Sequence, residues 1–99
     1  MTSDPIRDRR VQYDTDGLER DALHPDPMLQ WHGWHTDAFD AGVAEPNAMV
    51  LSTVDVHGHP DARVVLVRTA DRYGFTFFTN YESRKSHQMT ARPIAAATF

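Results

Sequence analysis

The sequence of 99 residues contains no cysteine. This absence excludes disulfide bonds, thiolate catalysis and cysteine-based metal sites, so any redox chemistry would need a bound cofactor. No apolar run approaches the length that crosses a membrane, and the first residues lack the apolar segment of a signal peptide. We therefore expect a soluble protein of the cytoplasm, long enough for one small domain.

Acidic and basic residues are distributed unevenly along the chain. Residues 1–62 hold twelve of the fourteen acidic residues but only four of the ten Lys and Arg residues. The other six basic residues lie in 63–99, with two acidic ones. This positive section predicts a local anion site, although a chance distribution of solvated charges would look the same. The cations are too few and too scattered for a nucleic-acid surface.

Apolar periodicity divides the chain into an irregular arm, residues 1–26, and one domain, residues 27–99. Asp26 and Pro27 open a helix predicted to reach about residue 44, and a second, short helix is predicted from Ser83 to about residue 91. Strands at 48–54, 61–68 and 75–79 are separated by short turns and predict an antiparallel meander. Residues 94–99 begin a fourth apolar segment at which the sequence stops. We expect an incomplete sheet that a further segment or a partner completes.

In the predicted strand at 61–68, an apolar run is flanked by a cation at each end. Because side chains alternate across a strand, Arg63 and Arg68 point to opposite faces, each at the end of an apolar row. An apolar row with an arginine suits a flat ligand that has a phosphate tail. The alternative interpretation is that both arginines extend into solvent.

Basic residues also lie where the second helix begins. Arg84 and Lys85 follow Ser83, in a turn where the helix dipole favours anions over cations. This unfavourable placement indicates an anion bound by free N–H groups, the Ser83 hydroxyl and the two cations, with the Thr79 hydroxyl nearby.

The histidines are a further candidate site. His32 and His35 lie three residues apart, a spacing that can bind zinc, but more ligands are needed and the adjacent Trp31 and Trp34 favour packing. We expect no metal site. The sequence has no Walker loop and no dinucleotide-binding glycine motif, and no Ser-His-Asp arrangement is identifiable.

From about residue 10 to residue 99, the chain resembles the N-terminal half of the pyridoxamine 5′-phosphate oxidase family. The resemblance rests on motifs in the family's order: Asp26-Pro27, Glu45-Pro46-Asn47-Ala48-Met49, Ser52-Thr53-Val54-Asp55, Arg63-Val64-Val65-Leu66-Val67-Arg68, Phe77-Phe78-Thr79-Asn80 and Ser83-Arg84-Lys85-Ser86-His87-Gln88. It implies a mainly β fold, the antiparallel FMN-binding split β-barrel, which works as a homodimer with FMN in the cleft between subunits.

The resemblance also implies roles for single residues. Those that would bind FMN are Arg63, Val64, Val65, Leu66, Phe78, Thr79, Ser83, Arg84 and Lys85. Arg68 stands where the family usually has a lysine that contacts the substrate phosphate, and Arg10 and Tyr13 match a segment that can fold over the substrate. The catalytic acid and base stay unassigned.

The activity that the resemblance implies is oxidation of pyridoxamine or pyridoxine 5′-phosphate to pyridoxal 5′-phosphate. FMN would take a hydride from C4′ of the substrate, and molecular oxygen would reoxidise the flavin. Arg68 favours a phosphorylated substrate. Two alternatives stay open: a flavin oxidoreductase of the same fold with another substrate, and a truncated module that binds FMN or dimerises without catalysis. The family's second half, with its further phosphate ligands, is absent from these residues.

Overall fold

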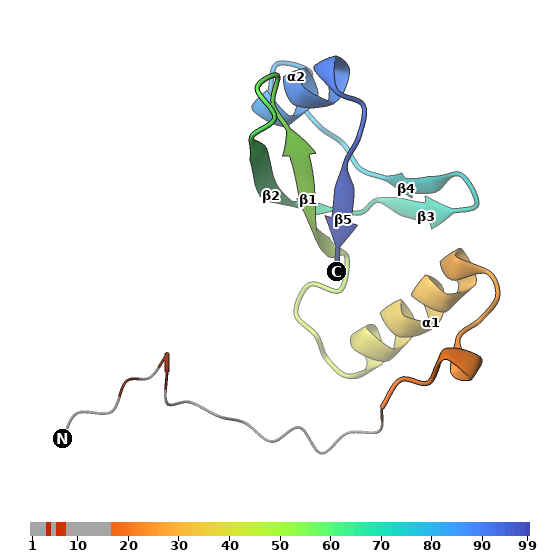
Figure 1. Ribbon diagram of the computed structural model, residues 1–99. Helices are drawn as coiled ribbons and strands as arrows, with labels where there is room; N and C mark the ends of the chain where they lie inside the picture. Colours follow the sequence, from red (N-terminus) through yellow and green to blue (C-terminus); the bar gives the residue numbers. More distant parts are fainter. Residues whose placement is uncertain (1–3, 5, 8–16) are drawn as a thin grey trace.

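The computed structural model describes Asp4, Ile6, Arg7 and residues 17–99 (Figure 1). The elements follow one another as η1 (Arg20–Ala22), α1 (Pro27–Asp40), β1 (Ala48–Val54), β2 (Pro60–Leu66), β3 (Thr69–Asp71), β4 (Gly74–Thr76), α2 (Arg84–Ala91) and β5 (Ala96–Thr98). All strand pairs are antiparallel, so the expected fold class is confirmed. Within the described residues, no helix is both long and apolar enough to cross a bilayer.

Strand β1 is the centre of a three-stranded sheet with the order β2-β1-β5. It pairs with β2 along its whole length, from Ala48 opposite Leu66 to Val54 opposite Pro60. The turn between them is closed by the Asp55 carboxylate, which accepts the backbone N–H groups of residues 57 and 59, both at 2.9 Å. Strand β2 therefore has one paired edge and one edge without a partner among the described strands.

The predicted three-stranded meander is wrong in its third strand. Strand β4 ends at Thr76 and pairs with β3 in a separate two-stranded sheet. A two-residue connection joins β3 to β4, and such short hairpins form from local sequence. The chain passes from one sheet to the other at residues 67 and 68. The Val67 N–H still donates to the Asn47 carbonyl beside β1, at 2.9 Å, whereas the Arg68 N–H donates to the Thr76 carbonyl of β4, at 2.7 Å.

Both helices begin at the predicted caps. The Asp26 carboxylate accepts the Met28 N–H at 2.9 Å, and the Ser83 hydroxyl accepts the Ser86 N–H at 3.3 Å. Helix α1 ends at Asp40 rather than near residue 44, because Gly42 has a φ of 79° and reverses the chain there. Helix α2 ends at residue 91, as predicted.

The core is small and lies between β1 and the elements that cover one face of it. Met49, Leu51 and Val67 are buried, and the partly buried side chains around them are Val65, Ala70, Phe75, Phe77 and Met89. Helix α2 lies at one end of the three-stranded sheet and α1 at the other end, beside the β3–β4 hairpin (Figure 1). Trp31 of α1 makes edge contacts with the rings of Phe75 and Phe99, at centroid distances of 5.1 and 5.3 Å. The outer face of β2 stays uncovered, so the split barrel is incomplete in this chain.

Candidate functional site

A groove of ≈ 590 Å³ follows β2 and continues past its end. Five consecutive residues, 64–68, line it together with Asn47, Phe78 and Lys85. Because neighbouring residues of a strand point to opposite faces, a groove that touches all five must also expose the strand backbone. The free edge of β2 can thus offer N–H donors and C=O acceptors beside the side chains.

The groove is lined by apolar and polar groups in similar measure, and its large apolar side chains are open to solvent. Val64 keeps 66% of its surface exposed, Leu66 56% and Phe78 77%. Large apolar side chains that lie exposed together are typical of a surface that binds a ligand or a partner. The groove therefore offers exposed apolar side chains next to an open strand edge.

Two cations enter the groove from different elements. Arg68 follows β2, and its guanidinium carbon lies 5.6 Å from the centre of the Phe78 ring. Lys85 belongs to the first turn of α2 and is half-buried. The predicted alternation along the strand is confirmed, since Val64, Leu66 and Arg68 are exposed where Val67 is buried. The arrangement suits a planar ligand that carries an anionic group.

Two predicted hydroxyls meet at the start of α2 and do not line the groove. The hydroxyl oxygens of Thr79 and Ser83 lie 3.3 Å apart, and the Ser83 oxygen also caps the helix. Thr79 directly follows Phe78, and Ser83 lies two residues before Lys85; both Phe78 and Lys85 line the groove. The hydroxyl pair thus fixes the segment between the apolar wall and the cation.

Arg63 lies on the opposite face of β2, toward the core. Its NH1 group donates to the Leu51 carbonyl at 3.0 Å and to the Thr53 hydroxyl at 2.7 Å. Its NH2 group donates to Gln88 Oε1 at 3.3 Å and lies 3.3 Å from the Asp61 carboxylate. These contacts engage the guanidinium within the protein, and its assignment to FMN stays a prediction.

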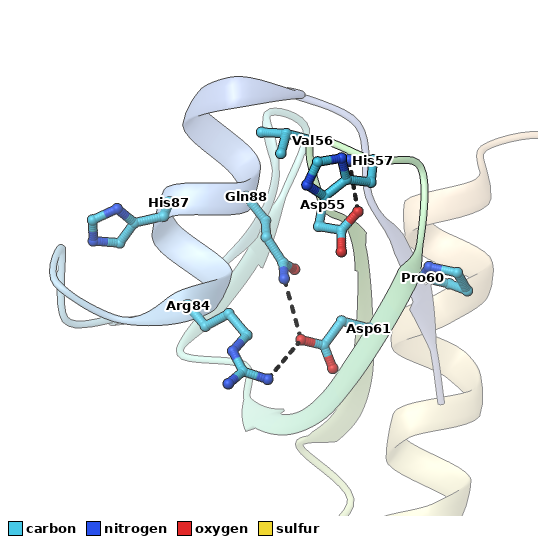
Figure 2. Close-up of a pocket in the computed structure, with 8 residues that line it drawn as sticks. All are labelled: Asp55, Val56, His57, Pro60, Asp61, Arg84, His87 and Gln88. Carbon is cyan, nitrogen blue, oxygen red and sulfur yellow. Dashed lines mark hydrogen bonds and ion pairs between the residues drawn. The ribbon is translucent and has the colours of Figure 1, made fainter.

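Arg84 points away from the groove, into a second cavity of ≈ 540 Å³ between α2 and the turn after β1 (Figure 2). Its side chain is 81% exposed, with NH1 3.7 Å from the Asp61 carboxylate. The hydrogen bond from Gln88 lowers the pKa of Asp61 below its usual value, with smaller contributions from the Ala62 N–H and the two arginine charges. Arg84 and Lys85 are neighbours in sequence but face different cavities.

The remaining sequence predictions concern the N-terminal arm and the histidines. Arg10 and Tyr13, expected near the substrate, lie outside the described residues. His32 and His35 form hydrogen bonds to the Ala70 carbonyl at 2.9 Å and to Asn47 Oδ1 at 2.6 Å. Throughout the described part of the chain, no three His, Asp or Glu side chains are grouped to hold a metal ion.

Asn47 and Val67 line the groove but were not among the site residues predicted from the sequence. They come together because the Asn47 carbonyl accepts the Val67 N–H, which extends the β1–β2 pairing by one step. The register of the β1–β2 pairing brings these two residues together, and this register cannot be derived from a single sequence.

Comparison with known proteins gives concordant matches. A sequence model of the family described as pyridoxamine 5′-phosphate oxidase matches residues 35–99. The pyridoxine/pyridoxamine 5′-phosphate oxidase of Thermobifida fusca (strain YX) is 50% identical over 97 residues, which cover 98% of this chain and 43% of that protein. The protein of that name from Burkholderia mallei (strain SAVP1) is 45% identical over 94 residues, covering 95% of this chain and 44% of the relative.

A solved structure also matches. PhzG from Burkholderia lata 383, crystallised in complex with tetrahydrophenazine-1-carboxylic acid, superposes with a TM-score of 0.77 at 30% identity. The match covers 85% of this chain and 42% of that one. The chain spans less than half the length of the relatives it matches.

Proposed function

The chain belongs to the pyridoxamine 5′-phosphate oxidase family. From this premise we propose that it binds FMN in the groove along β2 and forms part of a flavin-dependent oxidase. The observation that carries the proposal is the groove itself. It combines an apolar wall, an open strand edge and cations from two elements. The chain has no cysteine, so a bound cofactor is the natural source of redox chemistry.

The residues of the groove fit FMN. Its volume of ≈ 590 Å³ lies within the range of about 300–1,000 Å³ that is typical of small-molecule sites. Val64, Leu66 and Phe78 supply apolar contact for a ring system, and the free edge of β2 supplies polar partners for the heteroatoms at its rim. Lys85 at the start of α2 supplies a cation for the phosphate.

Arg68 is proposed as the contact for an anionic group of the substrate. Arg68 follows β2 whereas Lys85 lies on α2, so the groove offers a second cation besides the one proposed for the FMN phosphate. The planar guanidinium binds phosphate oxygens in pairs. FMN, when bound, supplies the two-electron oxidation, and Arg68 holds and orients the molecule that is oxidised. We propose pyridoxamine or pyridoxine 5′-phosphate as that molecule, in the cytoplasm.

A homodimer is the proposed working form. The outer face of β2 leaves Val64 and Leu66 more than half exposed, and FMN lying on it would still have one side open to solvent. A second copy that closes this side would bury the exposed apolar surface and exclude water from the flavin.

A second candidate is a flavin oxidoreductase that acts on an aromatic carboxylic acid. The solved relative PhzG holds tetrahydrophenazine-1-carboxylic acid, and its fold matches 85% of this chain. Arg68 beside the Phe78 ring suits a carboxylate on an aromatic ring as well as it suits a phosphate.

Flavin binding and turnover test the proposal in sequence. Titration of the purified protein with FMN, followed by quenching of flavin fluorescence, should give saturable binding. Oxygen-dependent conversion of pyridoxamine 5′-phosphate to pyridoxal 5′-phosphate, with hydrogen peroxide as co-product, should follow. A protein that binds no FMN contradicts both candidate functions. Binding with turnover of an aromatic carboxylic acid instead favours the second, and binding without any turnover favours a non-catalytic FMN module.

A further inference from the structure

Among the polar side chains buried on β1 and α2, Thr53 and Gln88 form a hydrogen bond with each other. Thr53 keeps 1% of its surface exposed and Gln88 keeps 8%. Burying a hydroxyl and an amide is unfavourable unless their hydrogen bonds are satisfied. They are satisfied here, since every buried side-chain polar atom among the described residues has a partner. Thr53 and Gln88 therefore form a specific hydrogen-bonded contact between β1 and α2, which we call the joint.

The Gln88 amide joins a cation to an anion. Its Oε1 accepts hydrogen bonds from the Thr53 hydroxyl and from Arg63 NH2, and its Nε2 donates to the Asp61 carboxylate at 3.2 Å. Figure 2 shows Gln88 extending from α2 toward Asp61 on β2. An amide can accept and donate at once, whereas an ionised glutamate lacks the donor, and methionine lacks the donor and is only a weak acceptor.

The joint connects the two elements that form the groove. Val64 and Leu66 line it from the outer face of β2, opposite the face that carries Arg63 and Asp61. Lys85 lines it from α2, three residues before Gln88 and thus within one helical turn. A helix of eight residues is not stable alone, so tertiary contacts decide where its first turn lies.

We propose that Gln88 is a positioning residue for the phosphate of FMN, a role that rests on the FMN site proposed above. Its amide holds α2 against the inner face of β2. This contact sets the distance between Lys85 and the apolar wall formed by Val64 and Leu66. Gln88 itself does not line the groove, so it acts through Lys85 and the N–H groups of the first helical turn.

Comparison of FMN with riboflavin separates positioning from general stability, because riboflavin has the same ring system without the phosphate. The ratio of the two dissociation constants reports the phosphate contacts alone. It would be measured for the wild type, Gln88→Met and Thr53→Val, each checked for folding by circular dichroism. Gln88→Met keeps the side-chain length, and Thr53→Val keeps the shape of a buried residue on the far side of the joint.

In Gln88→Met we expect FMN binding to weaken roughly tenfold, as for the loss of a contact to a charged group, with riboflavin binding unchanged. Thr53→Val should shift the ratio in the same direction by a smaller factor, and Thr53→Ser, which keeps the hydroxyl, should restore it. His87→Gln is the matched control, an exposed polar exchange next to Gln88, and should leave the ratio unchanged.

The outcomes distinguish this role from the proposed function. Equal weakening of both flavins, or no change in either, in a folded variant overturns the positioning role while the FMN site stands. If Gln88→Met does not fold, the Thr53 pair decides by the same criterion. A wild-type protein that binds neither flavin, or binds both equally, overturns the FMN site and the positioning role with it.

Discussion

Replacing Lys85 by methionine tests whether the phosphate of FMN lies in the groove along β2. The substitution keeps most of the aliphatic stem and removes the charge that α2 brings to the groove. A hydrogen bond to a charged group contributes about 1.5–3 kcal/mol, which is roughly a 10- to 150-fold change in the dissociation constant. Lys85 is only half-buried and the groove is open, so solvent screening places the expected loss at the lower end, about tenfold.

The matched control is Arg84→Met, one residue earlier on the same helix. Arg84 is 81% exposed and directed to Asp61 in the other cavity, so its loss should weaken FMN binding by less than about threefold. Both variants and the wild type would be titrated with FMN by fluorescence quenching at low and at high salt. The Lys85 variant should also show a shallower dependence on salt. Equal losses in both variants, or a larger loss for Arg84, would refute the assignment of the phosphate to the groove.

Two further predictions concern the substrate and the response to acid. Arg68→Gln should raise KM for the phosphorylated substrate at least about tenfold and change kcat much less, because the arginine would bind a group remote from the oxidised carbon. Steady-state kinetics measures both constants. An unchanged KM would contradict the role proposed for Arg68. The pKa of Asp61 is lower in the folded chain than its usual value of 3.8. The ionised carboxylate therefore stabilises the fold fully above the pKa of the unfolded chain, and this stabilisation is lost as the pH falls through the pKa of the folded chain. Denaturant unfolding of Asp61→Asn should therefore show less loss of stability in acid than the wild type. Parallel curves would contradict the stabilisation of the Asp61 carboxylate by the Gln88 hydrogen bond and the weaker arginine contacts.

The features that the sequence predicted correctly depend on neighbouring residues. Strand β1 occupies the expected residues, 48–54, because its apolar run is bounded by proline on one side and a turn on the other. The caps at Asp26 and Ser83 were readable because each acts on a backbone N–H two or three residues away. The alternation along β2 was readable because it follows from strand geometry alone.

The features that were missed depend on contacts between distant segments. The third strand was expected beside β2, but a two-residue hairpin pairs it with β3 instead. Arg63 could be assigned to one face of β2, but not to the Gln88 and Asp61 partners that engage it there. In the same way, the orientation of α2 places Arg84 and Lys85 in different cavities, and nothing local in a run of two basic residues decides which one lines the groove.

The most direct test of the FMN site is a map of the backbone amides that respond to FMN. It would be measured by nuclear magnetic resonance on the nitrogen-15-labelled protein, titrated with FMN. We predict the largest shifts at residues 64–68, at Phe78 and at Lys85, which line the groove, with little change at His57 and His87 in the other cavity. Shifts centred on His57 and His87, or none at saturating FMN, would contradict the site proposed along β2.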